Sequence, residues 1–137
     1  MNNNSSRRLA TTAAALLGCF VAASPAQEQC SPGNCRIAVT VTNCQAPGGI
    51  TVDLDPVPVD SPRNMRWEIV TPGYVFPANG IDFSPPNAQF EPKNSPKANE
   101  VHIFNRKTQN GDFYYYINIT DGSGNACARA DPTVRNN

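Results

Sequence analysis

The sequence is poor in the residues that carry most metal and acid–base chemistry. It has one histidine and one tryptophan in 137 residues, and its 11 basic residues are matched by 11 acidic ones. A chain without a basic excess lacks the electrostatic footprint of a nucleic-acid-binding protein. No apolar run has the length of a membrane-spanning helix, and no segment has the periodicity of an amphipathic helix. With 13 prolines spread along the chain, long helices are not expected.

Residues 1–26 have the composition of a secretory signal peptide. Arg7 and Arg8 precede an uncharged stretch over residues 9–23, and Ser24-Pro25-Ala26 places small residues at a cleavage site. Cleavage there would leave residues 27–137, which is 137 − 26 = 111 residues with 9 basic and 11 acidic side chains, a net charge of −2. This is the length of a single domain. We therefore predict an exported protein of the periplasm or the extracellular medium.

Two variants of this signal stay open. Leu16-Leu17-Gly18-Cys19 resembles a bacterial lipobox, in which Cys19 would carry a lipid and anchor the protein to a membrane. The soluble form is favoured because the apolar stretch continues past Cys19 to a good cleavage site. Ser6-Arg7-Arg8-Leu9 partly matches a twin-arginine signal, but an ordinary charged segment also accounts for the two arginines.

The other four cysteines form an even set, as expected in an oxidising compartment. Four cysteines allow three pairings. We favour a short Cys30–Cys35 loop together with Cys44–Cys127, which would join positions 83 residues apart. A zinc site is the rival interpretation, but the spacing is not that of two C-x-x-C pairs.

Apolar and polar residues alternate along several short segments, the pattern of a half-buried strand. Turn-forming residues separate these segments. Together they predict an all-β protein, an antiparallel β-sandwich of about seven strands. Pro56–Val59 is expected to be an edge or bulged strand because proline cannot donate to a ladder, and residues 84–97 are expected to form a long polar loop. The alternating segments are 36–42, 50–55, 65–69, 101–103 and 113–120.

Two resemblances support this fold. Gly111–Ile117 looks like the cupredoxin motif G-x-[YF]-x-Y-Y-C, which implies a cupredoxin-like or immunoglobulin-like sandwich. The chain also resembles small uncharacterised exported bacterial proteins in most of residues 37–136, a resemblance that implies a fold but no function. The segments that carry this second resemblance are Trp67-Glu68-Ile69, Gly73-Tyr74-Val75-Phe76, Gly80-Ile81, Tyr115–Ile119 and Asp131–Asn136.

The copper chemistry of cupredoxins does not follow from this resemblance. A blue-copper site uses two histidines, a cysteine thiolate and usually a methionine. Ile117 stands at the position of the cysteine ligand, Thr120 at that of a histidine, and Asn125 near that of the methionine. We therefore expect no metal and no other cofactor.

Few residues are candidates for other chemistry. His102 shares a strand face with Glu100 and could bind a metal weakly with Met65, but a solvated histidine is the commoner case. Asp53, Asp55 and Asp60 lie close in sequence, and paired carboxylates can hydrolyse glycosides. Asp53 and Asp55 fall on the polar face of a strand, which favours a solvated role, so no catalytic residue is expected.

Two tyrosines are the more informative feature. Tyr114 and Tyr116 alternate with the core positions of their strand and therefore point outward. Such a pair can form a rigid patch for a protein or glycan partner, or it can pack under the 84–97 loop. The sequence thus favours a non-enzymatic binding or structural module, without a membrane span. The alternatives are a metal-handling protein and a secreted hydrolase.

Overall fold

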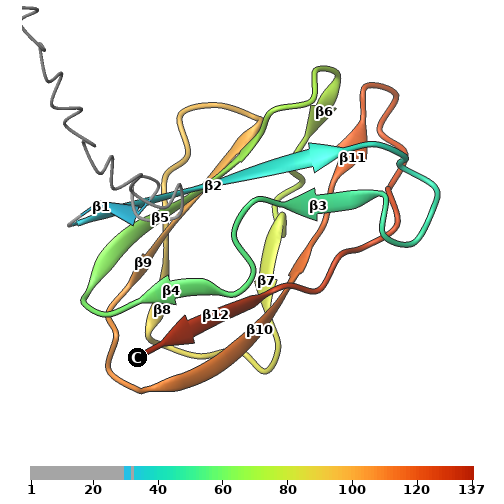
Figure 1. The fold of residues 1–137 in the computed structure, drawn as a ribbon. Helices are drawn as coiled ribbons and strands as arrows, with labels where there is room; N and C mark the ends of the chain where they lie inside the picture. Colours follow the sequence, from blue (N-terminus) through green and yellow to red (C-terminus); the bar gives the residue numbers. More distant parts are fainter. Residues whose placement is uncertain (1–29, 32) are drawn as a thin grey trace, which may run out of the picture.

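The computed structural model describes residues 30, 31 and 33–137 (Figure 1). The expected signal peptide and Cys19 lie outside these residues. All regular structure in the described part is β-strand, which confirms the all-β fold class. Among these residues there is no helix with the length and apolar character needed to cross a membrane.

The strands form two large sheets and one small one (Figure 1). The six-stranded sheet contains β1 (Cys30–Ser31), β2 (Asn34–Val41), β3 (Ile50–Val52), β5 (Arg63–Ile69), β8 (Phe90–Lys93) and β9 (Glu100–Asn105). The four-stranded sheet has the order β4 (Val57–Val59), β12 (Thr133–Asn136), β10 (Gly111–Ile117) and β7 (Ile81–Phe83). The two-stranded sheet pairs β6 (Tyr74–Val75) with β11 (Thr120–Asp121).

The described part of the chain has twelve strands, more than the seven or so that were expected. The extra strands have two to four residues, too few for alternation to reveal them. One of them, β8, lies inside residues 84–97, which were expected to be a loop throughout. Two pairings are parallel, β2 with β5 and β4 with β12. β4 is the segment Val57–Val59, and it occupies the edge position predicted from its prolines.

The alternating residues meet in the space between the two large sheets. Trp67 from β5 and Tyr115 from β10 are fully buried there. The Trp67 Nε1–H donates to the Tyr115 hydroxyl at 3.1 Å, and the two rings make an edge contact with centroids 5.4 Å apart. Phe83 of β7 stacks on Phe90 of β8 with the ring centroids 3.7 Å apart. This contact joins the two large sheets where their edge strands β7 and β8 face each other. Aromatic side chains from all four of these strands therefore tie the two layers together.

Two disulfides lie at opposite ends of β2. Cys30–Cys35 precedes most of the strand, and Cys44–Cys127 follows it. This is the pairing favoured from the sequence, and two disulfides are typical of an oxidising environment.

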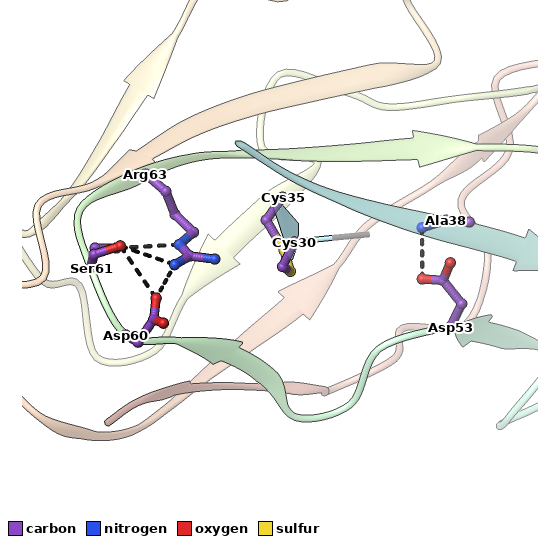
Figure 2. The surroundings of a disulfide bond; sticks show 7 residues. All are labelled: Cys30, Cys35, Ala38, Asp53, Asp60, Ser61 and Arg63. Atoms are coloured by element: carbon purple, nitrogen blue, oxygen red, sulfur yellow. Dashed lines mark hydrogen bonds and ion pairs between the residues drawn. A yellow bond between two sulfur atoms is a disulfide. The ribbon is translucent and has the colours of Figure 1, made fainter. Parts of the chain in front are cut away.

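Near the first disulfide, the buried guanidinium of Arg63 donates to Ser61 and pairs with Asp60 (Figure 2). Its partners satisfy a charge that would otherwise be costly to bury.

Because the Tyr115 hydroxyl is buried, we expect the free energy of unfolding to fall at alkaline pH. Burial raises the pKa of Tyr115 above its ordinary value of 10.0. In the unfolded chain the hydroxyl ionises near pH 10, whereas in the folded protein it stays protonated, so rising pH favours unfolding. We expect this one group to remove about 0.8 kcal/mol of stability by pH 10.5.

The test compares urea unfolding at pH 8.5 and pH 10.5. Tyr115→Phe should lose this part of the alkaline destabilisation, although it is less stable at both pH values by roughly 1 kcal/mol because Trp67 loses its acceptor. Ile117→Val is the matched control, since it weakens the same core without removing a titrating group. A Tyr115→Phe variant with the same pH slope as Ile117→Val would contradict the prediction.

Candidate functional site

The two predicted outward tyrosines lie on the outer face of the four-stranded sheet. Tyr115 and Ile117 of β10 are buried, whereas Tyr114 is 61% exposed and Tyr116 is half-buried. The 84–97 segment therefore does not cover Tyr114. The register places Thr133 of β12 beside Tyr114 and Arg135 beside Asp112 on the same face.

The tyrosine face, as we call it, consists of Asp112, Tyr114, Tyr116, Arg129, Thr133 and Arg135. Arg135 holds Asp112 with two hydrogen bonds of 2.7 and 3.0 Å, and this contact lowers the pKa of the Asp112 carboxyl. Arg129 lies over the ring of Tyr116 with its guanidinium carbon 4.6 Å from the ring centroid. These contacts restrain the charged side chains around the exposed ring of Tyr114.

The tyrosine face has an unusual composition for a surface with an exposed aromatic ring. Three large hydrophobic side chains are exposed in the described part of the chain, Val70, Val75 and Tyr114. The two valines belong to other segments, so Tyr114 is surrounded by charged and hydroxyl groups rather than by aliphatic ones. A protein–protein interface has an apolar centre from which charges are depleted. The tyrosine face instead offers one flat ring among hydrogen-bonding groups.

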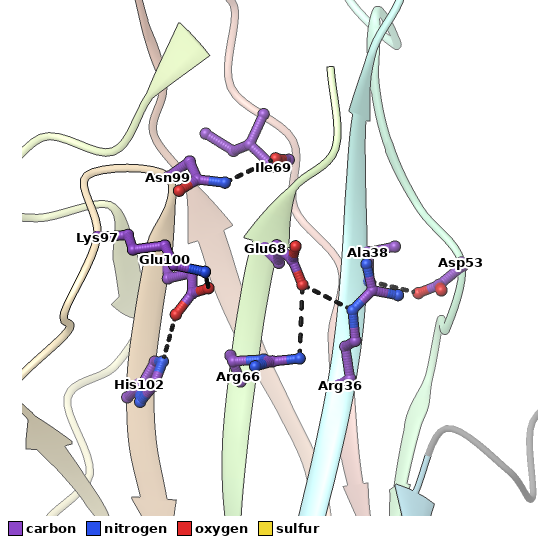
Figure 3. Close-up of polar contacts among 10 residues, drawn as sticks. All are labelled: Arg36, Ala38, Asp53, Arg66, Glu68, Ile69, Lys97, Asn99, Glu100 and His102. Atoms are coloured by element: carbon purple, nitrogen blue, oxygen red, sulfur yellow. Dashed lines mark hydrogen bonds and ion pairs between the residues drawn. The ribbon is translucent and has the colours of Figure 1, made fainter. Parts of the chain in front are cut away.

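The polar residues of the six-stranded sheet form a second cluster (Figure 3). The side chain of Glu100 is 3% exposed and contacts Lys97 Nζ and His102 Nε2, each at 3.0 Å. These hydrogen bonds, the one from Lys97 first, lower the pKa of the Glu100 carboxyl. Next to it, Glu68 accepts from Arg36 at 2.7 Å and lies 3.5 Å from Arg66. The cluster thus consists of two groups of polar contacts, one around each glutamate, on the outer face of β2, β5 and β9.

This cluster brings together part of the hypothetical metal site. His102 and Glu100 do contact each other, as their shared face predicts. Met65 pairs with Ile103 on the opposite face of the sheet and is fully buried in the core, so it cannot join them. Within residues 30, 31 and 33–137, no three histidine, cysteine, aspartate or glutamate side chains are placed to hold a metal ion.

The three candidate aspartates each contact a different partner. Asp53 accepts a hydrogen bond from the backbone of Ala38 in β2, at 2.8 Å. Asp55 accepts from the backbone of Thr133 in β12, at 3.0 Å. Asp60 pairs with Arg63. Each of the three carboxylates thus supports a different part of the backbone or a different side chain.

A buried group of amides was not predicted from the sequence. Asn136 donates to Gln89 and accepts from Asn105, both at 2.9 Å, and all three side chains are buried. The Gln89 amide nitrogen has no partner among the described residues. Asn105 and Asn136 continue the alternation of Val101-Ile103 and of Val134, so an extended alternation is the signal that could have found them. The group joins β9, β12 and the turn before β8, which gives it a structural role.

Comparison with known proteins adds no family to this description. No protein-family model matches the chain, and no curated protein has a detectably similar sequence.

Proposed function

We propose that the protein is an exported, non-enzymatic binding module that contacts a glycan chain through the tyrosine face. The observation that carries this proposal is the exposed ring of Tyr114 on the outer face of the four-stranded sheet, surrounded by charged and hydroxyl groups. Export is supported by the signal-like residues 1–26 and by the two disulfides.

The chemistry of a sugar ring matches this surface. One face of a pyranose presents C–H groups that pack on an aromatic ring, while its edges carry hydroxyls that need hydrogen-bond partners. Tyr114 supplies the ring. Thr133 and Arg135 lie beside it in the neighbouring strand β12, and Asp112, the partner of Arg135, lies two residues from Tyr114 in β10. Tyrosine is well suited to such contacts because its rigid side chain loses little entropy on binding.

The test is affinity electrophoresis of the mature protein through gels containing soluble neutral or acidic polysaccharides. We expect retardation by at least one class of polysaccharide. Tyr114→Ala should weaken this binding about fivefold, because an aromatic contact contributes roughly 1 kcal/mol.

The matched control is Phe104→Ala. Phe104 is also a partly exposed aromatic residue, but it lies on the outer face of the six-stranded sheet, where the register pairs it with Asn64 and Glu91. This variant should bind like the parent protein. Equal weakening by both substitutions, or migration that no polysaccharide affects, would refute the glycan proposal.

A further inference from the structure

Two grooves run along the side of the molecule where the edge strands β7 and β8 face each other. The first has a volume of about 370 Å³ and an apolar floor that includes Phe83, Phe90 and Pro86. The second, of about 320 Å³, extends toward Lys93 and Lys97. Ile81, Pro92 and Ile103 line both, so the grooves are continuous.

The free edge of β7 borders this groove. The Ser84 N–H donates to the Tyr114 carbonyl, and the Asn118 N–H donates to the Gly80 carbonyl. The backbone groups of the even-numbered residues in 80–84 therefore point toward β10. In an antiparallel pair the bonding positions alternate. The backbone groups of Ile81 and Phe83 therefore point away from β10, and both residues line the first groove. Two residues of β7 thus offer donors and acceptors for another strand.

Two other edge strands are closed to such pairing. In β8, the Phe90 N–H is bonded to Asn87, and Pro92 has no N–H to donate. In β4, the central residue is Pro58. The outer edge of β3 faces Arg129–Pro132 across a third groove. Proline commonly protects sheet edges from pairing with other chains, and β7 has none within its three residues.

The charge at this edge points to the chemistry of the partner. Asp82 is exposed at the centre of β7, and no hydrogen bond or ion pair to its side chain is found in the described part of the structure. In an added strand, the residue opposite Asp82 would lie on the same outer face, and its two neighbours would point toward the apolar groove. A basic residue between two apolar ones complements this arrangement.

We propose that β7 binds an extended segment of another protein as a fifth strand of the four-stranded sheet. The segment carries a basic side chain opposite Asp82 and an apolar side chain on each side of it, packed against Phe83 and Phe90. This site lies at the sheet edge beside Tyr116, which pairs with Asp82 in the register, whereas the glycan contact is centred on Tyr114. A second copy of this chain does not fit, because two antiparallel β7 strands centred on each other would set Asp82 against Asp82.

The probe is a phage-displayed library of random linear heptapeptides, selected on the mature protein. We expect enrichment of an apolar–basic–apolar pattern. The affinity of a selected peptide is then measured by fluorescence polarisation. Asp82→Lys should weaken it about tenfold, because an attractive cross-strand pair becomes a repulsive one. Asp131→Lys makes the same charge change at an exposed aspartate outside the groove and should leave the affinity unchanged.

A second measurement tests the backbone pairing. N-methylation of successive peptide nitrogens should abolish binding at alternate positions only, because every second N–H of an added strand faces β7. Tyr114→Ala should have no effect on the peptide, which separates this site from the glycan proposal. Failure of the library to enrich, equal binding by Asp82→Lys, or a lack of alternation in the N-methyl series would each overturn the inference.

Discussion

A Cys44→Ala/Cys127→Ala double variant is expected to lower the free energy of unfolding by about 4 kcal/mol. The disulfide joins residues 83 positions apart, so removing it frees a long loop in the unfolded chain. In the folded protein the two segments stay close, since the Ala128 N–H donates to the Cys44 carbonyl at 2.7 Å. The effect therefore arises mainly in the unfolded state, and it is a large fraction of the 5–15 kcal/mol typical of a folded domain.

The control is a Cys30→Ala/Cys35→Ala double variant, measured in the same urea titration without reductant. Its disulfide spans a sequence separation of 5 and constrains the unfolded chain far less. We expect a loss of about 2 kcal/mol, or half that of the longer loop. If the two variants lost equal stability, loop length would not be the cause, and local packing around each cysteine would have to explain the result.

Trp67→Ala is expected to cost about 4 kcal/mol of stability. The side chain is fully buried at the centre of β5, and its removal leaves a large cavity between the two main sheets. It also leaves the Tyr115 hydroxyl without the indole N–H that bonds to it. Both effects destabilise the same contact between the layers, so partial relaxation of the sheets cannot recover much of the loss.

The measurement for this variant has to avoid tryptophan fluorescence, because Trp67 is the one tryptophan of the sequence. Far-ultraviolet circular dichroism during urea unfolding serves for the parent and the variant alike. Trp67→Phe keeps an aromatic ring at the site and loses the hydrogen bond, so it should cost clearly less than Trp67→Ala. Equal losses would mean that the hydrogen bond, not the cavity, determines the effect.

The sequence predicted which residues face the core better than it predicted how the strands are arranged. Ile37, Val39, Met65 and Trp67 were placed inward by alternation alone, and all are buried. Alternation depends only on the geometry of one strand. The parallel pairing of β2 with β5 depends on contacts between segments distant in sequence, which a local pattern does not contain.

For the candidate surfaces, too, the sequence predicted the direction of a side chain but not the contacts between distant segments. The outward direction of Tyr114 followed from its position between core residues, and the structure confirms it. The groove beside β7 did not follow from any local pattern. It exists because Phe83 and Phe90, from different sheets, stack at facing edges. β8 was hidden from sequence reasoning by Pro92 and by its two charged neighbours, Glu91 and Lys93.

The inner position of β12 has a consequence for the order in which the four-stranded sheet can form. β12 follows every other strand in the sequence, yet it lies between β4 and β10. The four-stranded sheet therefore cannot be completed until residues 133–136 have been synthesised and have inserted between β4 and β10. The pairing of β10 with β7 does not depend on β12, whereas β4 has no other partner in this sheet. β4 therefore joins the sheet only after every other described strand has left the ribosome.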